Sequence, residues 1–109
     1  MARARTYSPP TRDAARLLGL EVARARRARR WSVAELAERV GVSHVTVRSV
    51  EKGALSVSIG TAFEIATTLG IDLFGTPEEV ERHIERGRDR LALLPASVRH
   101  THTDVDDDF

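Results

Sequence analysis

The sequence predicts an all-α fold of five helices in one small domain, followed by a flexible C-terminal tail. Aromatic residues are few (one Trp, one Tyr and three Phe among 109 residues), so Leu, Val, Ile and Ala must build the core. Such a core suits a helical bundle better than a β-sandwich. Apolar residues recur at intervals of three and four, and patterns typical of helix ends separate the apolar stretches. The length is that of a single domain.

Charge is unevenly distributed, although the formal net charge is only +1. Residues 1–52 contain 12 Lys and Arg against 5 Asp and Glu, whereas residues 53–109 contain 5 against 11. A basic half is what binding to phosphate requires. The alternative is a general bias toward arginine, because Lys52 is the only lysine in the chain.

Composition argues against several kinds of site. Without cysteine there is neither a disulfide nor a thiolate zinc site. His100 and His102, with Asp104 nearby, could be read as a metal site, but two histidines two residues apart make a weak ligand pair. No third or fourth ligand is fixed nearby, so no metal or other cofactor is expected. No glycine-rich phosphate loop or Ser-His-carboxylate grouping is present, and we expect no enzyme. Arginines interrupt the early apolar stretches, which argues against a signal peptide or a membrane span.

Residues 1–10 are expected to form a flexible basic arm that two prolines end. A first helix follows over about residues 11–30, with Thr11 as its N-cap. Its small and apolar side chains lie at helical spacing and predict one buried stripe. That stripe consists of Ala14, Leu17, Leu18, Val22, Ala25 and Ala28.

Residues 32–53, SVAELAERVGVSHVTVRSVEKG, predict two short helices joined at a glycine. Ser32 and Glu35 form the S-x-x-E capping box, in which each side chain bonds the other residue's backbone amide. Trp31 and Leu36 stand at the positions of a hydrophobic staple. The second helix of the chain therefore has the clearest start signal.

The turn between these two helices depends on Gly41, because glycine adopts positive φ at no steric cost. Ser43 caps the following helix, and Gly53 ends it. Ala37 supplies the small side chain that two steeply crossed helices need where they meet. The inner faces are apolar at Leu36, Val40, Val42, Val47 and Val50. This spacing is typical of a helix-turn-helix, whose second helix presents a row that could enter a major groove.

A fourth helix is expected over about residues 59–69, and Gly70 ends it. Its inward-facing residues are expected to be Ile59, Ala62, Phe63, Ile65, Ala66 and Leu69.

A fifth helix is expected from the capping signal Thr76-Pro77-Glu78-Glu79 to about residue 90. Its only strong apolar positions are Val80 and Ile84, a thin stripe that either caps the core or forms a modest dimer contact. The folded domain is thus expected over residues 11–90. Residues 91–109 form the tail, of which residues 91–98 could add a strand across a dimer.

With these residues identified, residues 20–74 resemble the five-helix domain of the Xre or lambda-repressor-like family of bacterial and phage regulators. The pattern L-A-x-x-x-G-V-S-x-x-x-(V/I)-x-x-(V/I)-E-x-G is matched at Leu36, Ala37, Gly41, Val42, Ser43, Val47, Val50, Glu51 and Gly53. Val33 departs from the family, which often has a phosphate-contacting glutamine there. The resemblance implies that Glu51 is structural and ties the recognition helix to its neighbours.

The resemblance also implies which side chains contact DNA. Base contacts are expected from His44, Val45, Arg48 and Ser49. Arg48 can pair with guanine O6 and N7, His44 with a purine N7, and Val45 can pack on a thymine methyl. Phosphate contacts, which position the helix without reading sequence, are expected from Ser43, Thr46 and Lys52.

A narrower resemblance concerns the second half of the chain. The segment SVSIGTAFEIATTLGIDLF, a fifth helix and a short acidic tail are similar to HipB-like antitoxins, which pair with a HipA-like kinase toxin. The tail places Phe109 behind Asp106, Asp107 and Asp108, a plausible peptide for a partner's groove. The alternative is an acidic end that only aids solubility.

The sequence therefore predicts a sequence-specific repressor that binds double-stranded operator DNA as a homodimer, with half-sites about one helical turn apart. The favoured role is the antitoxin of a HipBA-type toxin–antitoxin system, which represses its own operon and holds a kinase toxin. The alternatives are a stand-alone Xre-family regulator and an interaction adaptor that does not bind DNA. The expected location is the cytoplasm, in association with the nucleoid.

Overall fold

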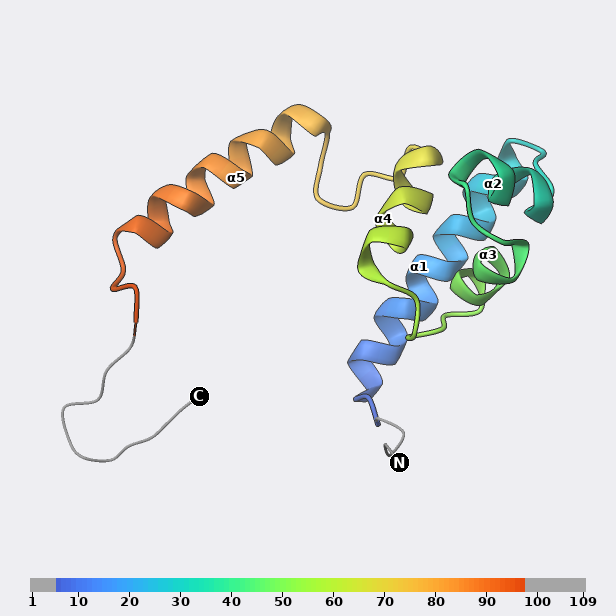
Figure 1. Cartoon of the computed structure of the whole chain (residues 1–109), viewed down its shortest axis with the longest axis horizontal. Helices are drawn as coiled ribbons and strands as arrows, with labels where there is room; N and C mark the ends of the chain where they lie inside the picture. The colour runs from blue at the N-terminus through green and yellow to red at the C-terminus, as the bar shows by residue number, and fades with distance from the viewer. Residues whose placement is uncertain (1–5, 98–109) are drawn as a thin grey trace. The chain divides into compact units, whose positions relative to one another are not determined.

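The computed structural model describes residues 6–97 of the chain, and this part consists of helices and turns without a strand (Figure 1). The helices are α1 (Pro9–Ala28), α2 (Val33–Val40), α3 (His44–Glu51), α4 (Ile59–Thr68) and α5 (Pro77–Ala92). The predicted all-α fold of five helices is confirmed. The first half of the expected basic arm (residues 1–5) and the acidic tail lie outside the described residues.

The chain divides into two compact units, residues 1–73 and residues 74–109. The first unit contains α1 to α4 and all of the buried core, and the second contains α5. The domain expected over residues 11–90 spans both units. Within residues 6–97, no helix combines the length and hydropathy that a membrane span requires.

The first helix starts earlier than the sequence predicted. α1 begins at Pro9, with Ser8 as the N-cap residue, and not after Thr11. Prolines fit the first helical turn because their φ is already helical and the missing N–H would have no partner there. The Thr11 hydroxyl hydrogen-bonds the Ser8 hydroxyl at 3.1 Å. The two prolines therefore start α1 and do not end the preceding arm.

The buried face of α1 also differs from the predicted stripe. Gly19, Val22 and Ala25 are buried, and Leu18 packs against the core. By contrast, Leu17 is 60% exposed, and Ala14 and Ala28 are also exposed. The prediction was wrong for these three residues because α1 turns its glycine toward α3, which rotates the stripe away from Leu17.

Gly19 is a point of close approach between α1 and α3. A Cβ atom added there would lie 2.5 Å from the carbonyl oxygen of Val50 and 2.6 Å from that of Glu51. Both atoms belong to the α3 backbone and cannot rotate away as a side chain would. Only glycine fits at this position, so α1 can hold the end of α3 in direct backbone contact (Figure 1).

Residues 32–43 fold as the capping signals predicted. The Ser32 hydroxyl accepts from the Glu35 amide at 3.0 Å, and the Glu35 carboxylate accepts from the Ser32 amide at 2.7 Å. These hydrogen bonds hold the pKa of the Glu35 carboxyl below its ordinary value. Gly41 then ends α2 in the left-handed conformation, with φ 87°. The turn leads directly to Ser43, whose hydroxyl accepts from the Thr46 amide at 3.2 Å.

The core lies among α1, α2, α3 and α4. Its fully buried large side chains are Leu36, Ile65, Val22 and Val47. Ala37, at the predicted crossing point of α2 and α3, is buried, and Val40 and Val42 pack against the core. Each buried Leu, Ile or Val contributes about 1.5–3 kcal/mol relative to an exposed one, so this small apolar cluster supplies most of the stabilising burial.

Two residues predicted to face inward on α4 do not. Ile59 is 71% exposed and Phe63 is 40% exposed, whereas Ile65, Ala66 and Leu69 are buried. Residues 59 and 63 are four apart and therefore share one side of the helix. The core-facing side follows residues 62, 65, 66 and 69 instead, because α4 packs against α2.

α5 begins as predicted and continues two residues past the expected end. The Thr76 hydroxyl accepts from the Glu79 amide, the Glu79 carboxylate accepts from the Thr76 amide, and Pro77 is in the first turn. No residue of α5 is buried. Capping and helix propensity stabilise α5, whereas burial of side chains in the shared core stabilises α1 to α4.

Replacing Gly19 with alanine tests the contact between α1 and α3. We expect Gly19→Ala to lower the free energy of unfolding by about 1–3 kcal/mol, because the added methyl group forces the two backbones apart. Gly60→Ala is the matched control, since a Cβ atom there meets nothing within 4 Å. That control should be neutral or stabilising by up to about 1 kcal/mol. Urea unfolding measures the free energy of unfolding of both variants. Equal changes in the two variants would contradict the close approach of α1 and α3.

Candidate nucleic-acid interface

The outer face of α3 carries the side chains predicted to read bases. His44, Val45 and Arg48 are exposed, and Ser49 is half-buried. Val45 leaves 62% of its surface in solvent although it is apolar. Val47 and Val50, on the opposite face, are buried in the core. α3 is thus an amphipathic helix with a short outward row of mixed chemistry.

The residues predicted to contact phosphate lie at the two ends of α3. Ser43 is the N-cap and Lys52 is the C-cap. The hydroxyls of Ser43 and Thr46 hydrogen-bond each other at 3.1 Å, so the cap is already ordered. A helix N-terminus favours negative charge through its free amides and its dipole. The start of α3 therefore has the polarity for an anion, and Lys52 adds a cation at the other end.

One guanidinium group connects α3 to the rest of the first unit. Arg26 of α1 donates from Nε to Glu51 Oε2 at 2.6 Å and from Nη2 to Glu51 Oε1 at 3.1 Å. Its remaining nitrogen, Nη1, donates to the Trp31 carbonyl at 2.9 Å. Both charged side chains are only 11% exposed. The hydrogen bond with Glu51 raises the pKa of the Arg26 guanidinium, which stays protonated.

Trp31 extends this network toward α2. Its ring is partly buried and packs against the core. The guanidinium carbon of Arg39 lies 4.1 Å from the ring centroid, and that of Arg29 lies 5.5 Å from it. Both distances are in the range of cation–π attraction. Trp31, the residue before the α2 cap, is therefore held in place through its carbonyl, which Arg26 contacts, and through its ring, which Arg39 and Arg29 contact.

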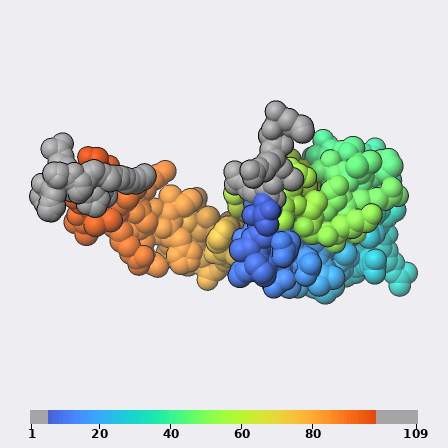
Figure 2. Space-filling model, turned by 90° about the horizontal axis from the view of Figure 1, so that it is seen from below, coloured from blue at the N-terminus to red at the C-terminus, as the bar shows by residue number. Residues whose placement is uncertain are grey.

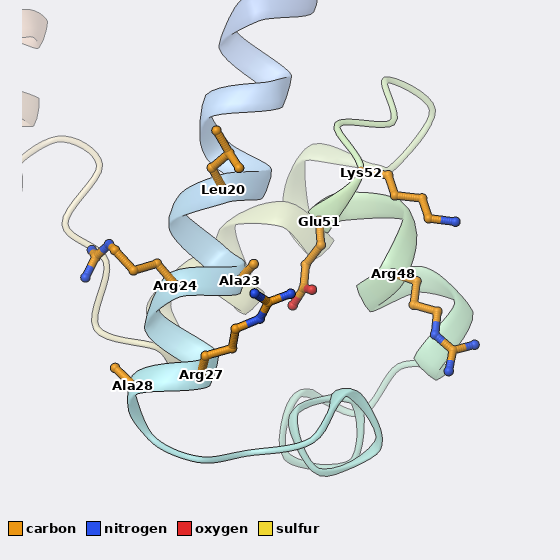
Figure 3. Close-up of a pocket in the computed structure, with 8 residues that line it drawn as sticks. All are labelled: Leu20, Ala23, Arg24, Arg27, Ala28, Arg48, Glu51 and Lys52. Atoms are coloured by element: carbon orange, nitrogen blue, oxygen red, sulfur yellow. The ribbon is translucent and has the colours of Figure 1, made fainter.

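A basic hollow lies between α1 and α3. Its lining residues are Leu20, Ala23, Arg24, Arg27, Ala28, Arg48, Glu51 and Lys52. Figure 3 shows Arg48 and Lys52 projecting from the same side of α3, whereas Glu51 points toward α1. In the space-filling view, the blue atoms of α1 border yellow-green atoms of the segment that follows α3 (Figure 2). The basic surface thus includes arginines of α1 that the sequence analysis did not single out.

A second hollow, rich in hydroxyl groups, lies on the other side of α3. Its lining residues are Val45, Thr46, Ser49, Ser56, Val57, Ser58 and Thr61. The Ser58 hydroxyl caps α4 by accepting from the Thr61 amide at 3.3 Å. The S-x-S sequence before α4 is the signal from which Ser56 and Ser58 could have been found.

Comparison with known families agrees with this geometry. Residues 22–75 match the family model described as Helix-turn-helix. This segment is a helix-turn-helix domain. The matched residues include α2, the turn at Gly41, α3 and α4. No curated protein and no solved structure matches the chain in the other two comparisons.

The helix-turn-helix match supports a DNA-binding transcriptional regulator. The matched domain has the lambda-repressor-like, all-α fold. Glu51 has the structural role that the resemblance implied, because it bonds Arg26. Within residues 6–97, no group of three or more His, Asp or Glu side chains is placed to hold a metal ion. The predicted partner-binding residues Asp106 to Phe109 lie outside the described residues.

Removing one member of the ion pair tests its role in the helix-turn-helix domain. We expect Glu51→Ala to lower the free energy of unfolding by about 3 kcal/mol, because it leaves the Arg26 charge buried without its partner. Glu21→Ala is the matched control. Glu21 also bonds an α1 arginine, Arg24, at 2.7 Å, but these side chains are 42% and 68% exposed. Its loss should cost less than about 1 kcal/mol. Equal losses in thermal or urea unfolding would contradict the structural role of Glu51.

Proposed function

We propose that this protein is a sequence-specific transcriptional repressor that binds a palindromic operator as a homodimer and inserts α3 into the major groove. His44, Val45, Arg48 and Ser49 contact base edges in this proposal. Ser43, Thr46 and Lys52 contact phosphates. Operator half-sites would lie about one helical turn apart, as the two-fold symmetry of a dimer requires.

The observation that carries the proposal is the exposed face of a firmly held α3. Arg48 and Lys52 project from one side of α3 (Figure 3), while Val47 and Val50 anchor the other side in the core. An α-helix with its side chains is about 10–12 Å across. That diameter fits the major groove, which is about 12 Å wide.

The basic hollow supports the same orientation on DNA. Arg27 of α1 lines it together with Arg48 and Lys52, so cations of two helices gather on one surface. A phosphate backbone attracts such a surface whatever its base sequence. An adaptor that does not bind DNA would have no use for this arrangement, and we therefore favour the repressor over the adaptor.

The narrower role that we propose is that of an antitoxin in a HipBA-type system. Its support is the similarity of residues 56–74 and of the acidic tail to HipB-like antitoxins. In this role, the first unit binds the operator, and the segment Asp106 to Phe109 helps to hold a kinase toxin. The stand-alone regulator is the competing function, and it predicts no stoichiometric protein partner.

Capture of partners distinguishes these two functions. The tagged full chain, purified from its native cells, is expected to bring down a kinase-like protein together with the promoter of its own operon. A matched chain lacking residues 100–109 should retain the promoter DNA and lose most of the kinase-like protein. DNA without a stoichiometric protein would support the stand-alone regulator instead.

Arg48→Ala tests the reading of bases. We expect a loss of roughly 1–3 kcal/mol in specific binding and relaxed preference at one operator position, as for an arginine bonded to guanine. Duplexes selected from a random pool by the unaltered protein serve as ligands in fluorescence anisotropy. Arg82→Ala, which removes the same charge from α5, is the control. Unchanged specific affinity in the Arg48 variant would exclude Arg48 as a base contact.

Lys52→Ala tests the contact with phosphate. This variant should bind every duplex more weakly by the same factor, because the phosphate backbone does not vary with sequence. The slope of log affinity against log salt should flatten by about one unit for each lost phosphate contact. A loss confined to the selected duplexes would show that Lys52 reads bases.

A further inference from the structure

α5 presents an apolar stripe that stays unburied among the described residues of its unit, 74–97. Ile84 is 48% exposed and Leu91 is 69% exposed, and none of the helix is buried. Its other surface is densely charged, so the stripe is bordered by Glu and Arg side chains. Exposed apolar side chains with a charged border are typical of an interaction surface.

The stripe has the spacing of a coiled coil. Val80, Ile84, Gly87 and Leu91 follow one another at intervals of four, three and four residues. This alternation is the repeat that keeps one seam of a helix facing a partner helix. Gly87 is the small member of the series, and nothing lies within 4 Å of where its Cβ atom would be. A partner could therefore approach most closely at Gly87.

We propose that α5 pairs with α5 of a second copy of this chain, with the two helices antiparallel. In this register Ile84 packs against Gly87 of the second copy, and Val80 packs against Leu91 of the second copy. Each layer combines a larger with a smaller side chain, which fills the seam without overpacking. The same two layers occur twice because the arrangement has two-fold symmetry.

Charge complementarity selects the antiparallel arrangement. Glu81 and Arg88 are seven residues apart and border the same edge of the seam. In an antiparallel pair, Glu81 faces Arg88 of the second copy, and this contact also occurs twice. In a parallel pair, Arg88 would face His83 instead, which offers no opposite charge. Flanking charges of this kind choose partner and orientation in coiled coils.

This pairing extends the proposed operator-bound homodimer, since it names the surface that joins the two copies. The helix has 16 residues, so the seam is short and the affinity of the dimer is expected to be moderate. The experiment therefore uses the full chain in the absence of DNA. Its outcome is then independent of operator binding, which the Arg48 variant tests separately.

Sedimentation equilibrium from about 1 μM to about 1 mM protein is expected to show a dimer. Ile84→Glu should weaken this dimer at least about tenfold, because it places two carboxylates in the seam. At concentrations too low for the dimer to form, its helix content and unfolding midpoint should not change, since the side chain is exposed in the single chain. Asp89→Arg and Arg82→Glu, on the side of α5 away from the seam, are controls and should leave the dimer intact.

Exchange of charges tests the antiparallel register. Glu81→Arg alone and Arg88→Glu alone should each weaken self-association, because each change creates two pairs of like charges. An equimolar mixture of the two variants should regain the dimer, as should the double variant Glu81→Arg/Arg88→Glu. Only the antiparallel pairing of Glu81 with Arg88 predicts both recoveries.

Several results would overturn the proposal. One is a chain that stays monomeric over the whole concentration range, and another is a dimer indifferent to Ile84→Glu. Charge variants that fail to recover on mixing would also exclude this register. A monomer that Ile84→Glu destabilises would show that the stripe packs within its own chain.

Discussion

The ion pair between Arg26 and Glu51 is the interaction on which the position of α3 depends. Arg26 uses three of its nitrogens, two on Glu51 and one on the Trp31 carbonyl. One side chain of α1 thereby fixes the last residue of α3 and the residue before the α2 cap. Burial strengthens these contacts and also makes the loss of either partner costly. A helix that reads DNA must be held in this way, because a small misplacement changes every base contact.

The backbone contact at Gly19 also holds the end of α3 against α1, as the ion pair does. Glycine lets α1 approach the carbonyl groups of residues 50 and 51 more closely than any side chain would permit. Glu51 is at the same end of α3, so the steric contact and the charged contact act on one place. The exposed residues of α3 add little to stability and are free to differ in chemistry. Stability and recognition are therefore carried by opposite faces of one short helix.

The two units of the chain are stabilised by different interactions. Helices α1 to α4 share a core of Leu, Ile, Val and Ala, whereas α5 depends on its capping box and on its own helical hydrogen bonds. An isolated helix of this length is only marginally stable in water. Pairing of its apolar stripe would supply burial that the single chain lacks. The proposed dimer contact and the proposed DNA contact are thus on separate units, and each can be altered without the other.

The sequence by itself determined the local features of this protein. Ser32 with Glu35, Gly41, Ser43, Gly53 and the Thr76 signal each mark a helix end through contacts within a few residues, and all were found where predicted. The helix-turn-helix spacing also identified the exposed row of α3 as the candidate site. These features need no knowledge of the rest of the chain, since capping and turn geometry are decided by neighbours in sequence.

Only the tertiary structure decided which faces are buried and which residues meet. Leu17, Ile59 and Phe63 are apolar and at helical spacing, yet they are exposed, because α1 is rotated by its contact at Gly19 and α4 by its packing on α2. The pairing of Arg26 with Glu51 joins residues 25 apart, and nothing in the arginine-rich stretch distinguishes Arg26 from its neighbours. The periodicity of the sequence indicates that a helix has an apolar side. Which residues of that side face the core is decided by the close packing of whole helices.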